Sequence, residues 1–167
     1  MSNLLIVEGE TEEKFFKTFK DLLNKQSLVK RCNLFQDSKG NKYMIGEKYD
    51  NVYIILDADM FTGNWDIFKR NYKNIIADKK FVFIQNKNFE DELVHALGLK
   101  NKNNLFKLFS ASGKDEFKSN FIKNDCRKKL KTLDFNKLYI RCRECEEQIP
   151  KDIKLPISNI KKLFKIK

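Results

Sequence analysis

The sequence has few prolines, a single histidine and no long apolar stretch. Its 167 residues include two prolines and one histidine, His95. No apolar run approaches the roughly 20 residues that a membrane-spanning helix needs. The opening apolar run, residues 4–7, is too short for a signal peptide and is followed at once by acids. These absences predict a cytoplasmic protein with no membrane partner, in which the cysteines stay reduced.

Complete motifs for zinc, for ATP and for a serine nucleophile are also missing. Cys142 and Cys145 have the spacing of half a zinc site, but the chain has no second CxxC pair and no histidine pair. Because the pair does not follow a βαβ pattern, we expect structural thiols rather than a redox centre. Without a GxxxxGK[ST] loop, ATP hydrolysis by this chain is disfavoured. Ser110 and Ser112 lack the partners of a catalytic triad.

Positive charge and phenylalanine are abundant. The formal net charge is +11, and 34% of the residues are charged, 41% are hydrophobic and 15 are phenylalanines. This length and composition predict one globular domain with a sizeable core. A strong positive charge attracts polyanions, so nucleic acid is the first partner to consider. The alternative is a lysine-rich surface that only keeps the protein in solution.

Apolar runs and amphipathic patterns alternate through the first hundred residues. Apolar runs predict four strands, at residues 3–9, 30–36, 51–59 and 79–86. Apolar residues at helical spacing predict helices after the first, third and fourth strands, at residues 11–25, 65–76 and 88–98. This order predicts an α/β fold with a mainly parallel central sheet flanked by helices.

The remainder, residues 99–167, is expected to form a helical, basic C-terminal extension packed on the core of residues 1–98. After a polar connector at 100–104, the pattern predicts helices at 114–123 and 125–133. Residues 137–143 fit either an edge strand or a helix. The tail after Pro150 fits either a basic arm or a lightly packed final helix.

Acidic residues follow three of the predicted strands. Glu8 ends the first strand, with Glu12 four residues behind it, and Asp57 and Asp59 follow the third. Glu90, Asp91 and Glu92 open the helix after the fourth strand. Ligands of an open α/β sheet gather at the carboxyl ends of its strands. Because these hard oxygen ligands suit Mg²⁺ or Mn²⁺, we predict that acids from the three segments bind one or two such ions.

Each acidic segment also has an ordinary structural interpretation. Glu8 and Glu12 could cap a helix, and an Asp-x-Asp after a strand could make a turn. The acids at 90–92 could be a solvated first turn placed for the helix dipole. Their joint occurrence after three strands of a +11 chain favours the metal site, because so many converging acids need a compensating cation.

The segments "LLIVEGETE" and "VYIILDAD" resemble the Toprim domain, which topoisomerases, DnaG-type primases and several nucleases share. The resemblance covers about the first hundred residues and implies a Toprim core at 1–98. The details are most similar to the Toprim nucleases of the OLD family and of bacterial phage defence. Those show an ExxxE, matched by Glu8 and Glu12, a DxD, matched by Asp57 and Asp59, and a later acid pair that Glu90 and Glu92 could supply.

The resemblance implies roles for these residues. Glu8 would be a metal ligand or a proton-transfer group, Asp57 and Asp59 would be metal ligands, and Glu12, Glu90 and Glu92 would complete one or two ion sites. Lys114, in "SASGKDEF", is similar to a lysine that contacts the scissile phosphate in that family. Glu8, Asp57, Asp59 and Lys114 are thus the catalytic candidates.

The expected function is a Mg²⁺- or Mn²⁺-dependent nuclease that hydrolyses phosphodiester bonds of DNA or RNA, as an anti-phage effector. Because OLD nucleases attach this domain to an ATPase, a separate ATPase or other regulatory chain is a candidate partner. One alternative is a non-catalytic nucleic-acid-binding or regulatory subunit of a larger complex. Another is a Toprim ribonuclease of RNA maturation, which differs only in its substrate.

Overall fold

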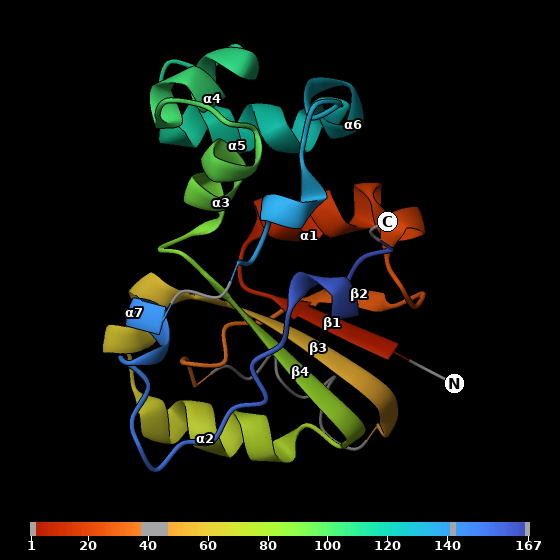
Figure 1. Cartoon of the computed structure of the whole chain (residues 1–167), viewed down its shortest axis with the longest axis vertical. Helices are drawn as coiled ribbons and strands as arrows, with labels where there is room; N and C mark the ends of the chain where they lie inside the picture. The colour runs from red at the N-terminus through yellow and green to blue at the C-terminus, as the bar shows by residue number, and fades with distance from the viewer. Residues whose placement is uncertain (1–2, 38–46, 141–142, 166–167) are drawn as a thin grey trace.

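The described residues form one parallel sheet of four strands. The computed structural model describes residues 3–37, 47–140 and 143–165. The strand order is β2-β1-β3-β4, with β1 at Asn3–Val7, β2 at Leu28–Arg31, β3 at Tyr49–Asp57 and β4 at Ala77–Gln85. Every neighbouring pair is parallel, and Figure 1 shows helices on both faces of the sheet. The predicted α/β class with a mainly parallel central sheet is confirmed.

The two central strands form where the sequence is apolar at consecutive positions. Residues 4–7 of β1 and 52–56 of β3 are all buried, as expected for parallel strands covered on both faces. The predicted strand at 30–36 was placed too late, since β2 ends at Arg31. The chain makes one more bond to β1, from Cys32 N–H to Val7 O (2.8 Å), and then turns where Asn33 Oδ1 accepts the Phe35 N–H (2.9 Å).

Three helices follow strands of the sheet: α1 (Glu10–Thr18), α2 (Trp65–Asn74) and α3 (Phe89–Ala96). The predicted helix at 11–25 was too long. After Thr18 only a 3-10 turn continues it, and the chain then pairs Leu23 with Phe164 of the tail. A tertiary contact thus overrides helix propensity at that point. The predicted strand at 51–59 extends too far, since β3 ends at Asp57 and a 3-10 helix, η3 (Ala58–Thr62), follows it.

The C-terminal extension is helical, as predicted, with different bounds. Its helices are α4 (Lys102–Leu108), α5 (Lys114–Lys123), α6 (Cys126–Lys129) and α7 (Arg143–Glu146). Helix α5 agrees with the prediction, whereas α4 begins inside the predicted connector and α6 ends well before residue 133. Residues 138–140 join no strand of the described sheet, and Arg141 and Cys142 lie outside the described residues.

The tail is neither a free arm nor a long helix. It forms a 3-10 turn, η5 (Ile160–Lys162), and buries Leu163 and Phe164. Further upstream, Ile157 pairs with Val82 of β4 as a single parallel bridge. Apolar side chains therefore hold the tail on the core in spite of its lysines.

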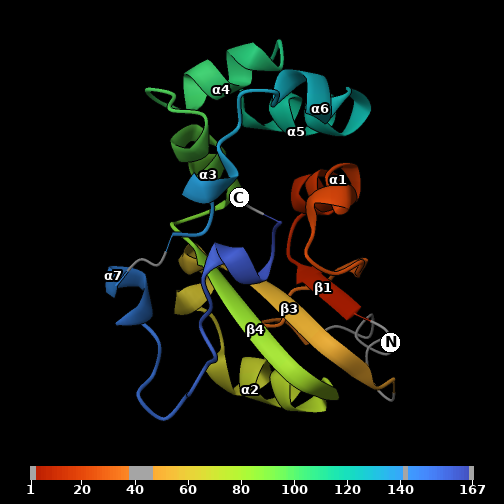
Figure 2. The same ribbon diagram turned by 45° about the vertical axis from the view of Figure 1, so that its right-hand side comes forward.

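Each face of the sheet carries its own hydrophobic core. Figures 1 and 2 show α1 and α3 on one face and α2 on the other. The α1 face buries Phe15, Phe16 and Phe89 together with side chains of the extension. The α2 face buries Phe35 and Phe68. The chain thus has the layers of an α/β fold, helix on sheet on helix.

Aromatic contacts join the extension to the α1 face. The ring centroids of Phe89 and Phe121 are 6.0 Å apart, those of Phe16 and Phe164 5.9 Å, and those of Phe16 and Tyr139 6.3 Å. The extension therefore packs on residues of the first 98, while a domain boundary at 98 stays a prediction. In the described part of the chain, no helix has the length and apolar character needed to cross a membrane.

We predict that Phe16→Ala lowers the free energy of unfolding by about 3–5 kcal/mol, because a fully buried ring shared by α1, Tyr139 and Phe164 is lost. Urea denaturation followed by Trp65 fluorescence measures it. Leu28→Ala is the control, since Leu28 is 51% exposed and its truncation is expected to have little effect. Equal losses in the two variants would contradict the assignment of the core.

Candidate functional site

Five carboxyl groups lie near one another at the carboxyl edge of the sheet. Glu8 follows β1, Asp57 ends β3, Asp59 lies in η3, and Glu12 and Glu90 lie in the first turns of α1 and α3. The negative charges of Glu12, Glu8, Asp59 and Glu90 all act on Asp57. We call these five residues the acidic cluster. They meet because parallel strands end at one edge and β1 neighbours β3, which neighbours β4.

Burial and mutual repulsion make this cluster costly to ionise. Burial is the largest cause that raises the pKa of Glu8 to about 7, of Glu12 to about 8 and of Asp57 to about 9. Neighbouring carboxylates raise these pKa values further, and no lysine, arginine or histidine of the described chain offsets them. In the metal-free protein Glu12 and Asp57 are therefore largely protonated at neutral pH, and ionising them needs a cation that these described residues do not supply.

One oxygen at the centre of the cluster has no partner. Asp57 Oδ1 is buried and accepts no hydrogen bond from the described residues. An unsatisfied buried acceptor is uncommon in a folded protein and calls for an explanation, such as an ion or a water. Together with the missing cation, this atom makes Asp57 the natural centre of a cation site.

Hydrogen bonds fix Glu8 and Glu12. Glu12 Oε2 accepts the Gly9 N–H (2.6 Å) and Glu12 Oε1 accepts Gln85 Nε2–H (2.5 Å). Glu8 Oε1 accepts Asn33 Nδ2–H (3.0 Å). Gly9 cannot be replaced freely, since a Cβ there would lie 2.9 Å from Glu12 Oε2. Sequence reasoning missed Asn33 and Gln85, although a polar Gln85 at the end of the apolar run "FVFI" was a usable signal.

Two of the predicted site residues are not brought into the cluster. Both oxygens of Glu92 accept backbone N–H groups, Oε1 from Asn86 (2.7 Å) and Oε2 from Tyr139 (2.8 Å). Glu92 therefore ties the extension to the end of β4, and its carboxylate is not turned to the other acids. Lys114 is exposed at the start of α5, and among the described contacts none links it to the cluster. Asp91 pairs with Lys102 (2.9 Å).

The donor set of the cluster fits Mg²⁺ or Mn²⁺ in chemistry. Among the described residues, no group of three or more His, Cys, Asp or Glu side chains is already arranged to hold a metal ion. Mg²⁺ does not need such a group, because it usually takes one or two protein carboxylates and keeps several waters. Carboxylate oxygens, one of them unpartnered, and the lack of a cationic side chain suit that mode of binding.

The cysteines that the structure describes are structural in character. Cys126 and Cys145 are buried, Cys32 is half-buried, and none of the three forms a disulfide. Burial raises the pKa of Cys32 and of Cys126 to about 11, which leaves both thiols protonated and unreactive at neutral pH. Cys142, the other member of the predicted pair, lies outside the described residues.

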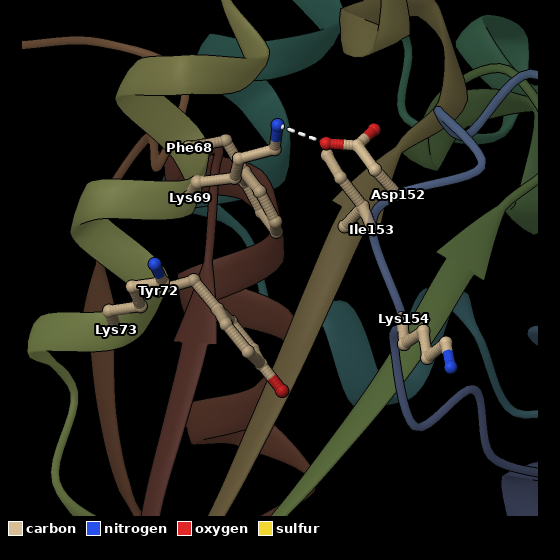
Figure 3. Close-up of a pocket in the computed structure, with 7 residues that line it drawn as sticks. All are labelled: Phe68, Lys69, Tyr72, Lys73, Asp152, Ile153 and Lys154. Carbon is tan, nitrogen blue, oxygen red and sulfur yellow. Dashed lines mark hydrogen bonds and ion pairs between the residues drawn. The ribbon is translucent and has the colours of Figure 1, made fainter.

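A separate pocket of about 330 Å³ lies on the α2 face. Figure 3 shows it between α2 and the segment 152–154, with the ion pair of Lys69 Nζ and Asp152 Oδ2 (2.5 Å) linking the two. Its lining contains no member of the acidic cluster: Phe68, Lys69, Tyr72, Lys73, Asp152, Ile153 and Lys154. We therefore treat the acidic cluster, and not this pocket, as the candidate site.

Comparison of the chain with protein-family models, with curated proteins and with solved structures finds no match. The resemblance to the Toprim domain therefore stays a prediction that rests on the acidic motifs. What can be argued about function comes from the geometry of the cluster itself.

We predict that the metal-free protein loses stability as the pH rises from about 4 to 8. Glu8, Glu12 and Asp57 have folded-state pKa values of about 7, 8 and 9, whereas unfolded carboxyl groups titrate near 4. The folded state therefore binds more protons in this window, so the free energy of unfolding falls, by up to about 1.4 kcal/mol per pH unit for each such group. Denaturation in EDTA across this range measures it.

The same argument predicts that Asp57→Asn stabilises the metal-free protein at pH 8 and changes little at pH 4. Asp115→Asn is the matched control, because Asp115 is exposed on α5. A stability that is flat or rises with pH in the wild-type protein would contradict the proposed burial of these acids.

Proposed function

We propose that the protein is a metal-dependent nuclease of the Toprim type, which hydrolyses phosphodiester bonds of DNA or RNA. One observation carries the proposal: four other carboxyl groups lie close enough for their charges to act on Asp57, whose buried Oδ1 has no partner among the described residues. A divalent cation would satisfy both the charge and the oxygen. The remaining steps concern the metal, the proton and the nucleic acid.

Asp57 and Asp59 are the proposed metal ligands, with Glu12 and Glu90 completing the negative site. A bound Mg²⁺ or Mn²⁺ would supply a Lewis acid for the phosphate and would lower the pKa of a coordinated water. The chain contributes the fixed carboxylates, because hydrogen bonds from Gly9, Gln85 and Asn33 orient Glu12 and Glu8 before any ion binds. Such preorganisation is what a site for charge stabilisation requires.

Glu8 is the proposed group for proton transfer. It is half-buried, and its pKa of about 7 lies where a group can accept or release a proton near neutral pH. Its second oxygen, Oε2, is not used by the hydrogen bond from Asn33. Glu8 can therefore take the proton of the attacking water and pass it to solvent.

The extension is the proposed source of affinity for nucleic acid. Residues 1–98 contain 15 Lys and Arg against 15 Asp and Glu, whereas residues 99–167 contain 19 against 8. The whole net charge of +11 therefore comes from the extension. Helices α4, α5 and α6 lie together at one end of the molecule (Figures 1 and 2) and expose Lys107, Lys118 and Lys128. These cations suit contacts with phosphates.

A second candidate is a nucleic-acid-binding or regulatory subunit that works only beside a partner, such as a separate ATPase. The arrangement of the acids gives it some support, since Glu12 already uses both oxygens in hydrogen bonds and no three acids share one point among the described residues. The two functions differ in turnover by the isolated chain.

We expect the purified protein to cleave nucleic acid with Mg²⁺ or Mn²⁺ and to lose this activity in EDTA. Asp57→Asn removes the central charge and is expected to reduce the cleavage rate by about 100-fold or more. Asp115→Asn, a change of the same chemistry on exposed α5, should cleave as the wild type does. Plasmid DNA, single-stranded DNA and structured RNA are compared as substrates, which also separates a DNA nuclease from an RNA-maturation enzyme.

The outcomes distinguish the candidates. Cleavage that survives Asp57→Asn would show that the ligands are assigned wrongly. Binding of Mn²⁺ and nucleic acid without turnover, with activity only after a partner is added, would favour the regulatory subunit.

We predict that Lys118→Gln together with Lys128→Gln weakens nucleic-acid binding and makes it less dependent on salt. Each lost phosphate contact is expected to reduce the slope of log K against log salt by about 0.9 on duplex DNA. Fluorescence anisotropy at several salt concentrations measures it. Lys79→Gln, at an exposed lysine of β4, is the control and should leave the slope unchanged. If the double variant and Lys79→Gln show the same slope of log K against log salt, the phosphate contacts lie elsewhere.

A further inference from the structure

Two buried polar side chains lie beside the acidic cluster, and one of them, Tyr139, has no role in the function proposed above. Gln85, at the end of β4, is 0% exposed, and Tyr139, in the extension, is 2% exposed. Gln85 pairs in register with Asp57 across β3 and β4. It also shares a sheet face with Phe83, whose ring centroid is 6.4 Å from that of Tyr139. All four therefore lie on the face that α1 covers.

Gln85 fixes the direction of a cluster carboxylate. Its Nε2–H donates to Glu12 Oε1 at 2.5 Å, while the Gly9 N–H holds the other oxygen of Glu12. An amide can present either its NH₂ group or its carbonyl oxygen, and only the NH₂ group attracts a carboxylate. The position of Glu12 therefore depends on which way the Gln85 amide is turned.

The hydroxyl group of Tyr139 could determine which way the Gln85 amide is turned. Its hydroxyl is buried and forms no hydrogen bond to the described residues, and the same holds for Gln85 Oε1. Burial raises the pKa of Tyr139 well above its usual value, the charges of Glu12, Glu92 and Asp57 raise it further, and a polar interaction with the Gln85 side chain lowers it. The Gln85 amide therefore neighbours the hydroxyl, at a geometry that falls short of a hydrogen bond. A donor and an acceptor, each left over, can satisfy one another by a small rotation.

The backbone holds Tyr139 in a conformation that a bulky residue seldom adopts. Its φ is 51°, in the left-handed region. Its N–H donates to Glu92 Oε2 (2.8 Å), and Glu92 Oε1 accepts the N–H of Asn86, the residue after Gln85 (2.7 Å). Glu92 thereby fastens the segment of Tyr139 to the end of β4. Strained residues of this kind gather at functional sites.

We infer that Gln85 and Tyr139 are positioning residues of the acidic cluster: Tyr139 Oη–H orients the Gln85 amide, and the amide holds Glu12 in place for the cation. The inference rests on the proposed function in one respect: the group that Glu12 faces is taken to be a divalent cation. It assigns the C-terminal extension a part in the site, since Tyr139 comes from it. Neither residue is expected to touch the nucleic acid.

Nuclear magnetic resonance of the metal-free protein tests the first contact. Tyr139→Phe removes one oxygen and keeps the ring, so we expect the fold to persist and the side-chain NH₂ resonances of Gln85 to move. Tyr72→Phe, a change of the same chemistry on α2, is the control and should leave them in place. Gln85→Leu lacks the side-chain NH₂ group, so the resonances that are missing from its spectrum are assigned to Gln85.

Calorimetric titration with Mn²⁺ tests the second contact. Loss of an outer-shell partner usually weakens metal binding or activity by about 10–100-fold. We expect a loss in that range for Gln85→Leu and a smaller one, near 10-fold, for Tyr139→Phe. The kcat for cleavage should fall with little change in the KM for nucleic acid.

The results separate this inference from the proposed function. The inference is overturned if folded Tyr139→Phe keeps both the Gln85 resonances and the Mn²⁺ affinity of the wild type. The melting temperature of this variant does not alter that conclusion. If wild-type protein binds no Mn²⁺ and cleaves nothing, the proposed function fails. In that case the resonances of Gln85 in Tyr139→Phe alone decide the inference, and unmoved resonances overturn it.

Discussion

Buried carboxyl groups that have no cationic partner among the described residues are the constraint on which the rest of this structure depends. Asp57 ends a strand that is covered on both faces, and its environment combines desolvation with the charges of Glu8, Glu12, Asp59 and Glu90. A protein can tolerate such a group by protonating it, by pairing it or by binding an ion. In the part of the chain that the structure describes, the pairing option is not used.

The surroundings of the cluster make it rigid rather than loose. Glu12 is held by Gly9 and Gln85, and Glu8 by Asn33. Glu92 uses both oxygens to fasten the segment of Tyr139 against the end of β4. The bonds from Gly9 and Gln85 lower the pKa of Glu12, but burial and the neighbouring carboxylates outweigh them, so its pKa stays raised, at about 8. Hydrogen bonds thus hold mutually repelling carboxyl groups close together, which indicates that their proximity serves a function.

Much of the fold could be predicted, because its signals are local. The apolar runs of β1 and β3 and the stripe of α1 are read directly from the sequence, and so is the position of Glu8 and Asp57 at strand ends. The errors have two origins. Helix α1 ends early because Leu23 pairs with Phe164, a partner far along the chain that no local pattern shows. Strand β2 is short because Asn33 makes a local turn with Phe35, a signal that the sequence did contain.

The site residues likewise divide into those that could be predicted from the sequence and those that could not. Glu8, Glu12, Asp57, Asp59 and Glu90 could be predicted to meet, since parallel strands bring their carboxyl ends to one edge. The different role of Glu92 could not, because it is set by the N–H of Tyr139, 47 residues away. Gln85 and Tyr139 were missed for a related reason. A single polar residue in an apolar run shows that it needs a partner, but it does not show which one.

The distribution of charge along the chain bears on how a polyanion could reach an acidic site. A phosphate backbone is repelled by the cluster, and residues 1–98 have no excess of positive charge to offset that repulsion. The extension carries the whole excess. It packs against α3 through Phe121 of α5 and against α1 through Phe164 of the tail. Long-range attraction to the extension and local attraction to a bound cation would then act in sequence. On the proposed function, the extension would therefore be part of the site rather than an appendage to it.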